Sequence, residues 1–389
     1  MRAGRFETGT WGYPPFVPAP LPPARPINLS RITRLISDAD QALGRLDGVA
    51  TTLPNPELFV AMYIHREAVL SSQIEGTQAS LTDVLEFEDA DAEESADVSE
   101  VVNYVAAMRL GIERLESLPL SLRLIKEIHG RLMQGVRGEN RSPGEFRRTQ
   151  NWIGPPGSTR ETATFVPPPP AVMTEALGHL EVFLHDDSLP TLVHAALCHA
   201  QFETIHPFLD GNGRVGRLLV TFLLCQRGVL HQPLLYLSHY LKRHRTEYYD
   251  RLQAIRVDGR WEEWLEFFLR GVKEVSIEAT STSRNILSLR HRHRQQLQDA
   301  GGGASGNLLR LHDVLFQHPI CSAASIERRL NITAATANSL IRKMVELGIL
   351  VQKTQGRRNR RFTYEEFLNL FEDEPQTFHN ADQEPPGEG

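Results

Sequence analysis

Twelve consecutive residues, H-P-F-L-D-G-N-G-R-V-G-R at 206–217, bring together the side-chain types of this chain that are best suited to chemistry. Histidine is the side chain whose ordinary pKa lies near neutrality, so His206 suits a general base. Asp210 offers a carboxylate, and Mg²⁺ commonly binds one carboxylate together with phosphate oxygens and waters. Phe208 is the aromatic residue of the segment, and we expect it to be buried beneath the histidine.

The residues after Asp210 predict a loop that leads into the N-terminus of a helix. The turn consists of three residues that tolerate tight backbone bends, Gly211, Asn212 and Gly213. The first N–H groups of a helix lack internal partners and carry partial positive charge, so they bind anions. Two arginines near this end, Arg214 and Arg217, are unfavourable there unless an anion is bound. The segment therefore predicts a polyphosphate site.

The segment resembles the signature of Fic-domain proteins, H-x-F-x-D/E-G-N-G-R-x-x-R, and matches it at every fixed position. The resemblance implies that His206 deprotonates a target hydroxyl and that Asp210 holds Mg²⁺ on the α- and β-phosphates of ATP. It implies nucleotide binding by the other fixed residues, Phe208, Gly211, Asn212, Gly213, Arg214 and Arg217. AMP would pass to a Ser, Thr or Tyr hydroxyl, and pyrophosphate would leave. Relatives that transfer a terminal phosphate have Ala-Asn-Lys instead of Gly-Asn-Gly, so nucleotidyl transfer is favoured, while UMP or phosphocholine transfer stays open.

A second string, S-S-Q-I-E-G at 71–76, ends an inhibitory helix that we predict over residues 57–76. A carboxylate at a helix C-terminus opposes the helix dipole, so we expect a positive partner for Glu75, and Arg217 is the candidate. The string resembles the family's inhibitory motif, S/T-x-x-x-E-G/N, through Ser71, Glu75 and Gly76. This resemblance implies that the glutamate fills space that the γ-phosphate needs. Because the string precedes the signature, the chain resembles the subclass of the family that has an N-terminal inhibitory helix. The alternative is that Glu75 is a surface residue at the end of a capped helix.

Residues 144–170 interrupt the helical pattern with Thr, Trp, Ile, Phe and Val around a Gly/Pro turn. This composition predicts a β-hairpin, closed by the prolines 167–170, which cannot donate to a strand ladder. In the family a hairpin before the signature acts as a flap that binds the target segment by strand addition. The resemblance therefore implies that a protein target with a hydroxyl side chain docks on residues 148–166. The alternative is a hairpin that only covers the core.

The C-terminal residues 307–366 predict a compact basic module. Residues 307–364 contain ten basic and three acidic side chains, a net charge of +7. Because the formal net charge of the whole chain is −6, the other residues together carry −13. Three short amphipathic patterns, followed by strand–turn–strand with an arginine-rich tip, resemble a winged helix-turn-helix. Positive charge is typical of modules that contact DNA phosphates, so residues 307–364 are a candidate DNA-binding region. Formation of a homodimer and docking of the protein target are the alternatives.

The whole pattern predicts a mainly α-helical, Fic-type core with a small β-hairpin flap and a C-terminal winged helix-turn-helix. After the flap, helical patterns cover 171–186, 189–205, 213–228 and 243–290. The predicted divisions are an N-terminal region 1–110, a catalytic core 111–290, a linker 291–306, the module 307–366 and a disordered acidic tail 367–389. The three cysteines include no C-x-x-C pair, and no run is apolar enough for a signal peptide or a membrane span. We therefore expect a cytoplasmic protein without a membrane partner.

Two other functions fit parts of the sequence. A nucleotide-sensing, DNA-binding transcriptional regulator would use the same pocket without catalysis, but sensing requires neither the base His206 nor the carboxylate Asp210. A metalloenzyme would use His194, His199 and His206. The first two of these are five residues apart on a predicted helix, which does not place them on one face, and no H-E-x-x-H string occurs. The sequence therefore predicts an autoinhibited protein adenylyltransferase.

Overall fold

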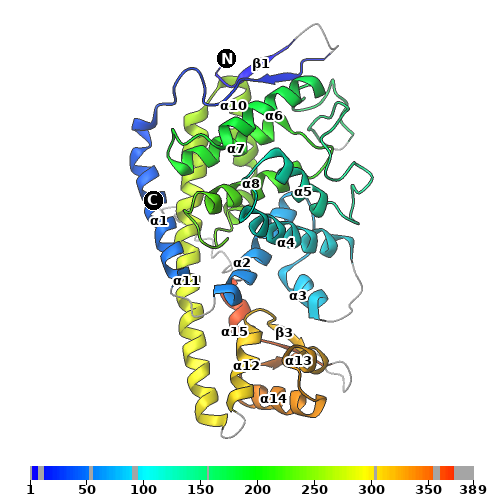
Figure 1. Ribbon diagram of the computed structural model, residues 1–389, viewed down its shortest axis with the longest axis vertical. Helices are drawn as coiled ribbons and strands as arrows, with labels where there is room; N and C mark the ends of the chain where they lie inside the picture. The colour runs from blue at the N-terminus through cyan, green and yellow to red at the C-terminus, as the bar shows by residue number, and fades with distance from the viewer. Residues whose placement is uncertain are drawn as a thin grey trace, which may run out of the picture.

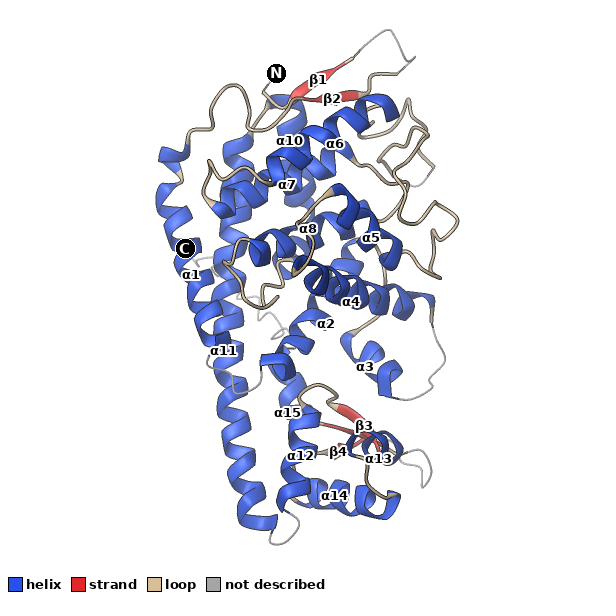
Figure 2. Ribbon diagram, viewed as in Figure 1, coloured by secondary structure: helices blue, strands red, loops and turns tan. Residues whose placement is uncertain are grey.

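The computed structural model describes residues 2–7, 13–51, 56–89, 95–155, 157–301, 305–353 and 360–371. It is mainly helical, as predicted, and the strands of these residues form two small antiparallel sheets at opposite ends of the molecule (Figure 2). Within the same ranges, no helix is long and apolar enough to cross a membrane.

The body of the molecule is built from helices that precede and follow the flap. Before the flap come the short η1 (Leu29–Arg31), α1 (Thr33–Thr51), α2 (Pro56–Ile74), α3 (Leu81–Asp89), α4 (Ala96–Leu115) and α5 (Leu122–Leu132). After it come α6 (Pro170–Leu184), α7 (Thr191–Ile205), α8 (Asn212–Gln226), α9 (Ser238–Arg243), α10 (Arg245–Asp258) and α11 (Trp261–Gly301). The predicted inhibitory helix corresponds to α2.

Helices α7 and α8 lie at the centre of this body (Figure 1). Every residue of α7 from Leu192 to Ile205 is buried, whereas the sequence predicts only a buried stripe. The difference arises because α6, α8, α10 and α11 all pack against α7. Helix α4 approaches α8 closely, since a Cβ on Gly111 would lie 2.2 Å from the ring of Phe222. The loop between α7 and α8 is therefore anchored at both ends by buried helices.

Helix α11 has 41 residues and runs along one side of the molecule to the C-terminal module (Figure 1). Two sequence predictions are wrong here. The pattern over 243–290 is two helices, because Gly259 adopts a left-handed conformation (φ 68°) that ends α10. The predicted linker 291–306 is largely helix, because Leu297 is buried and Gln296 Nε2 donates to Leu347 O at 2.9 Å. Contacts with the C-terminal module therefore stabilise α11 as a helix in a polar stretch of sequence that predicts a linker.

The flap differs from the predicted hairpin. Among the described residues between 144 and 169 it contains a single antiparallel bridge, between Ile153 and Phe165. Side chains bind much of the remaining backbone, and Gln150 Nε2, for example, donates to Pro167 O at 2.9 Å. The N-terminal ribbon of β1 (Gly4–Phe6) and β2 (Phe16–Pro18) continues from the flap, because Phe16 N donates to Val166 O at 2.9 Å. The N-terminal ribbon and the flap, which are distant in the sequence, thus lie side by side.

The C-terminal module contains α12 (Ser305–Leu315), α13 (Ala323–Leu330), α14 (Ala334–Glu346) and the strands β3 (Ile320–Ser322), β4 (Val351–Gln352) and β5 (Arg361–Thr363), in the sheet order β3-β5-β4. Thr333 caps α14 as predicted, since its side chain accepts from Thr336 N. The predicted acidic tail begins too early: α15 (Glu365–Leu368) and η3 (Asn369–Phe371) follow β5, and Phe371 packs on Tyr63 of α2 with ring centroids 5.4 Å apart. The predicted arginine-rich tip at 354–359 and residues 372–389 lie outside the described residues.

Candidate nucleotide site

The loop between α7 and α8 is held in its conformation by backbone turns and hydrogen bonds among its own residues. His206 follows the end of α7 in the left-handed conformation (φ 50°), and Gly211 has φ 77° just before α8. Asn212 fixes the loop, because its Oδ1 accepts from Phe208 N at 2.8 Å and its Nδ2 donates to Phe208 O at 2.9 Å. The Gly-Asn-Gly triplet therefore forms a turn, and the first N–H groups of α8 have no partner within the helix.

Phe208 is buried, as predicted, and stacks on a residue that the sequence does not reveal. Its ring lies parallel to that of His129 on α5, with centroids 3.7 Å apart. Gly144 N donates to His129 Nδ1 at 2.8 Å, so the proton is on Nε2, which lies 3.1 Å from Asp210 O. Burial lowers the pKa of His129 to about 4, so the ring keeps this neutral form at pH 7. His129 is thus a structural support of the loop.

Arg147 and Asn151, which precede the bridge at Ile153, hold the backbone of the loop at His206 and Phe208. Arg147 Nε donates to His206 O at 3.0 Å, and Asn151 Nδ2 donates to Phe208 O at 2.9 Å. The imidazole Nδ1 is buried without a hydrogen-bond partner. Burial, helped by the charges of Arg256 and Arg147, lowers the pKa of His206 to about 3, so the ring is neutral at pH 7. A neutral imidazole is the form that accepts a proton, as a general base must.

Asp210 lies at the rim of the loop, where 37% of its side chain is exposed. Its Oδ1 accepts from Gly211 N at 2.7 Å and lies 3.8 Å from Arg214 Nη2. Nowhere in the described ranges do three His, Cys, Asp or Glu side chains gather into a metal site. Mg²⁺ does not require such a cluster, because phosphates and waters complete its shell around one exposed carboxylate. Asp210 therefore fits a Mg²⁺ ion that arrives with a nucleotide.

Both arginines of the segment are buried on α8 and pair with acidic residues of the N-terminal region. Arg217 Nη2 lies 2.7 Å from Glu75 Oε1, and Arg217 Nε donates to Ser71 Oγ at 2.7 Å. Arg214 Nη1 donates to Glu100 Oε2 on α4 at 3.4 Å. The ion pair predicted between Glu75 and Arg217 is confirmed. Two carboxylates thus balance the positive charge at the start of α8.

The carboxylate of Glu75 lies against the first turn of α8. A Cβ on Gly213 would be 2.2 Å from Glu75 Oε1, so only glycine leaves room for the carboxylate there. Burial would raise the pKa of Glu75, but the charge of Arg217 and its hydrogen bond lower it on balance, so the group is ionised at pH 7. Gly76 has φ 103° and ends the helix, as predicted. A carboxylate of the chain itself therefore lies beside the N-terminus of α8, bound there through Arg217.

Sequence reasoning missed several side chains that complete this site, namely His129, Arg147, Asn151, Glu100 and Glu203. Glu203 lies on α7 with Oε1 buried and unpartnered, 2.4 Å from where a Cβ of Gly216 would be. Burial raises the pKa of Glu203 to about 7 against the opposing charge of Arg217. The one available signal was that Glu203 is the only Asp, Glu, Lys or Arg residue of α7. The other four lie far from the signature, and nothing in their spacing connects them to it.

The three histidines of the metal-site alternative are not brought together as ligands. His194 Nε2 contacts Phe183 O at 2.7 Å. His199 has Gly216 O at 2.8 Å from Nδ1 and the Tyr248 hydroxyl at 2.9 Å from Nε2. Both rings therefore have core partners of their own.

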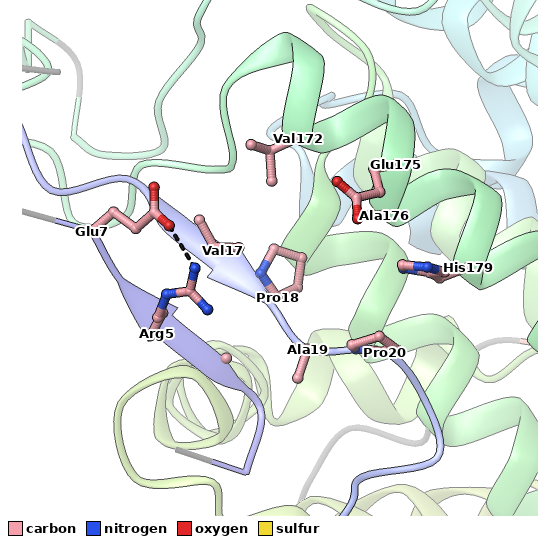
Figure 3. Close-up of a pocket in the computed structure, with 11 residues that line it drawn as sticks. Arg5, Glu7, Val17, Pro18, Ala19, Pro20, Val172, Glu175, Ala176 and His179 are labelled. Atoms are coloured by element: carbon pink, nitrogen blue, oxygen red, sulfur yellow. Dashed lines mark hydrogen bonds and ion pairs between the residues drawn. The ribbon is translucent and has the colours of Figure 1, made fainter. Parts of the chain in front are cut away.

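A cavity of about 410 Å³ lies between the β1–β2 ribbon and α6 (Figure 3). Arg5 and Glu7 form an ion pair on one side of it, and Glu175 and His179 of α6 lie on the other. None of its lining residues belongs to the segments 71–76 or 206–217. The cavity is therefore separate from the candidate nucleotide site.

Comparison with known proteins agrees with this geometry. Residues 33–113 match the family described as Fic/DOC family N-terminal, and residues 119–224 match the Fic/DOC family itself. A crystal structure of a Fic family protein from Desulfovibrio desulfuricans G20 has a similar fold, with a TM-score of 0.57, 20% identity, and coverage of 88% of this chain and 98% of that one. The fold and the matched residues define a Fic-domain protein.

Nearly half of this chain, residues 33–113 and 119–224, is thus similar to the Fic/DOC family. The chain is 35% identical over 138 residues to the protein adenylyltransferase Fic of Aedes aegypti, covering 35% of this chain and 24% of that protein. It is 32% identical over 159 residues to the protein of the same name from Drosophila grimshawi, covering 40% of this chain and 29% of that protein. The match thus spans less than a third of the length of these relatives.

Proposed function

We propose that this chain is an autoinhibited protein adenylyltransferase, which transfers AMP from ATP to a Ser, Thr or Tyr hydroxyl of a protein target and of itself. The observation that carries the proposal is the Glu75–Arg217 pair, which places the carboxylate of Glu75 against the first turn of α8. An internal carboxylate there occupies an anion site next to a neutral imidazole, an exposed carboxylate and a second buried arginine. The names of the relatives support the same activity.

In the proposed reaction, the target hydroxyl gives its proton to His206 Nε2, since Nδ1 is buried. The hydroxyl oxygen bonds to the α-phosphorus, and the bond from that phosphorus to the bridging oxygen of the β-phosphate breaks. Pyrophosphate leaves with the electron pair of this bond, and AMP remains on the target. Arg214, Arg217 and the first N–H groups of α8 stabilise the negative charge of the phosphates. When bound at Asp210, Mg²⁺ would neutralise charge on the α- and β-phosphates.

The inhibition follows from competition for one guanidinium group. Arg217 donates to Glu75 Oε1 from Nη2 and to the Ser71 backbone oxygen from the same nitrogen at 3.0 Å. A γ-phosphate that approaches Arg217 would meet the carboxylate at the same place, and two negative groups repel each other. ATP then binds unproductively until Glu75 moves away.

The decisive experiment compares the parent chain with the Glu75→Gly variant, using ATP labelled on the α-phosphate. We expect incorporation of labelled AMP to rise by at least about tenfold, because the variant frees Arg217 for the γ-phosphate. Parallel reactions with labelled UTP and a cell extract, followed by mass spectrometry, identify the transferred group and the targets. Absence of AMP transfer by the Glu75→Gly variant in all of these reactions would contradict the proposal.

We propose further that the protein target docks on the flap, residues 148–166. Support comes from Asn151, which joins the flap to the catalytic loop, and from Trp152, whose side chain is exposed. An extended target segment bound along the flap backbone near Asn151 would lie close to His206. Trp152→Ala should therefore reduce modification of an identified target more than self-modification. Equal reduction of both would contradict docking at this place.

The C-terminal module is proposed to bind duplex DNA as a winged helix-turn-helix. The basic charge of residues 307–364 supports this, and Arg342 of α14 is exposed. We expect a gel shift with duplex DNA that weakens as salt rises, and Arg342→Ala should weaken it. No shift at low salt would exclude DNA and leave protein docking or self-association as the role of the module.

A further inference from the structure

The segment that carries Glu75 has a second buried anchor, which the proposed function does not use. Thr77 follows Glu75 by two residues and is 3% exposed, and its Oγ1 donates to Glu100 Oε2 at 2.9 Å. Glu100 lies on α4 and is itself 2% exposed. Hydrogen bonds to a charged acceptor are stronger than those between neutral groups. This contact is therefore a substantial restraint on the end of the inhibitory segment.

The same carboxylate oxygen also binds an arginine of the signature. Arg214 Nη1 lies 3.4 Å from Glu100 Oε2, and the exposed Arg137 reaches the other oxygen, with its Nε 3.6 Å from Oε1. Glu75 meanwhile binds Arg217, one turn further along α8. The two phosphate-facing arginines are thus each joined to the same short N-terminal segment, one directly and one through Glu100.

The position of Glu75 depends on anchors on both sides of a flexible residue. On one side, α2 ends at Ile74, and on the other, Gln78 N donates to Asp97 Oδ2 of α4 at 2.7 Å. Between them, Gly76 has a positive φ of 103° and the conformational freedom of glycine. If the anchor at Thr77 is lost, the turn has more freedom, and Glu75 is less firmly held on Arg217.

We propose that the Thr77 hydroxyl is a latch for the inhibitory glutamate, and that Glu100 is a positioning residue shared by this latch and Arg214. The inference rests on the proposed function and adds a second site of control to it. With the latch closed, Glu75 stays on Arg217 and ATP binds unproductively. With the latch open, Glu75 leaves Arg217 more often, and the γ-phosphate takes its place.

Thr77→Val tests the latch, because it removes the hydroxyl and keeps the shape of the side chain. We expect self-incorporation of AMP to rise by about fivefold over the parent, less than in Glu75→Gly, since the population of the open state rises while Glu75 remains. Thr77→Ser should restore the parental rate. In the Glu75→Gly background, Thr77→Val should change the rate by less than about twofold, because no glutamate is left to hold.

Thr280→Val is a matched control on α11, where the hydroxyl is also buried and donates to Ser276 O at 2.7 Å. It should leave the rate of AMP incorporation unchanged. The latch is overturned if Thr77→Val behaves as the parent, if it changes the rate equally in both backgrounds, or if Thr280→Val activates as strongly. If instead the Glu75→Gly variant transfers no AMP at all, the proposed function itself fails, which is a separate result.

Discussion

The candidate nucleotide site and the C-terminal module are both rich in arginine, but the arginine side chains are buried to different extents. Arg214 and Arg217 are nearly inaccessible, and their partners come from residues more than a hundred positions earlier in the chain. In the module, Arg329 and Arg361 keep 22% and 26% of their side chains exposed, and they pair with Asp89 and Glu86 of α3.

A buried cation at a helix N-terminus has to be explained by an anion, because desolvation makes an unpaired charge costly. An exposed cation needs no such explanation, since water and salt stabilise it. The buried arginines of 206–217 therefore predict that the ligand is an anion. The basic charge of the module predicts only a positively charged surface and does not determine which partner binds there. The expected effects of four substitutions test this difference.

The largest effect is expected from His206→Ala in the Glu75→Gly background. Loss of the general base should lower the rate of AMP transfer by about 10²- to 10⁴-fold, while nucleotide binding persists through α8 and its arginines. Incorporation of labelled AMP and binding of ATP by calorimetry are measured on the same preparation. If the double variant transferred AMP at the rate of the Glu75→Gly parent, His206 would not be the general base. The proposed functional difference between segment 206–217 and the C-terminal module would then lose support.

Arg329→Ala should have the next largest effect, on stability. Asp89 has only 1% of its side chain exposed, and its Oδ2 has no partner, so loss of Arg329 leaves a buried charge without compensation. We expect the free energy of unfolding to fall by about 3 kcal/mol. Urea denaturation measures the change, and restoration by Asp89→Asn in the same chain would confirm that the unpaired carboxylate is the cause. A loss below about 1 kcal/mol would mean that this contact is exposed in solution.

Glu203→Gln should alter the pH dependence of stability. Because the folded chain raises the pKa of this carboxyl to about 7 from an ordinary value of 4.5, the parent has the full contribution of the protonated group below pH 4.5 and loses it as the pH rises through 7. Glutamine has no such titration. The stability of the variant relative to the parent should therefore grow by about 2 kcal/mol between pH 5 and pH 8. Denaturation curves that stay parallel across this range would show that Glu203 does not titrate there.

The smallest effect is expected from Arg361→Ala, because its partner Glu86 has 37% of its side chain exposed, whereas Asp89, the partner of Arg329, has 1%. Its ion pair with Glu86 is accessible to water and salt, so its removal should lower the free energy of unfolding by no more than about 1 kcal/mol. The same urea experiment measures it. A loss as large as that of Arg329→Ala would show that the two ion pairs are not distinguished by burial.

Several features were predictable because they depend on neighbouring residues. The turn at 211–213, the helix that follows it, the end of α2 at Gly76 and the cap at Thr333 all follow from backbone preferences within a few positions. Features that depend on packing were not predictable in the same way. The linker predicted over 291–306 is mostly helix, and the flap has one bridge instead of a hairpin, because distant contacts outweigh local composition.

The sequence by itself determined which groups the proposed chemistry would use: a histidine, a carboxylate, a Gly-Asn-Gly turn and two arginines in one twelve-residue segment, and a glutamate that we expect to oppose them. Only the tertiary structure decided what supports and restrains that segment. His129 under Phe208, Arg147 on the backbone of His206, and Glu100 between Thr77 and Arg214 come from separate elements. Local rules act within a few residues, whereas the pairing of buried charges depends on which helices pack together.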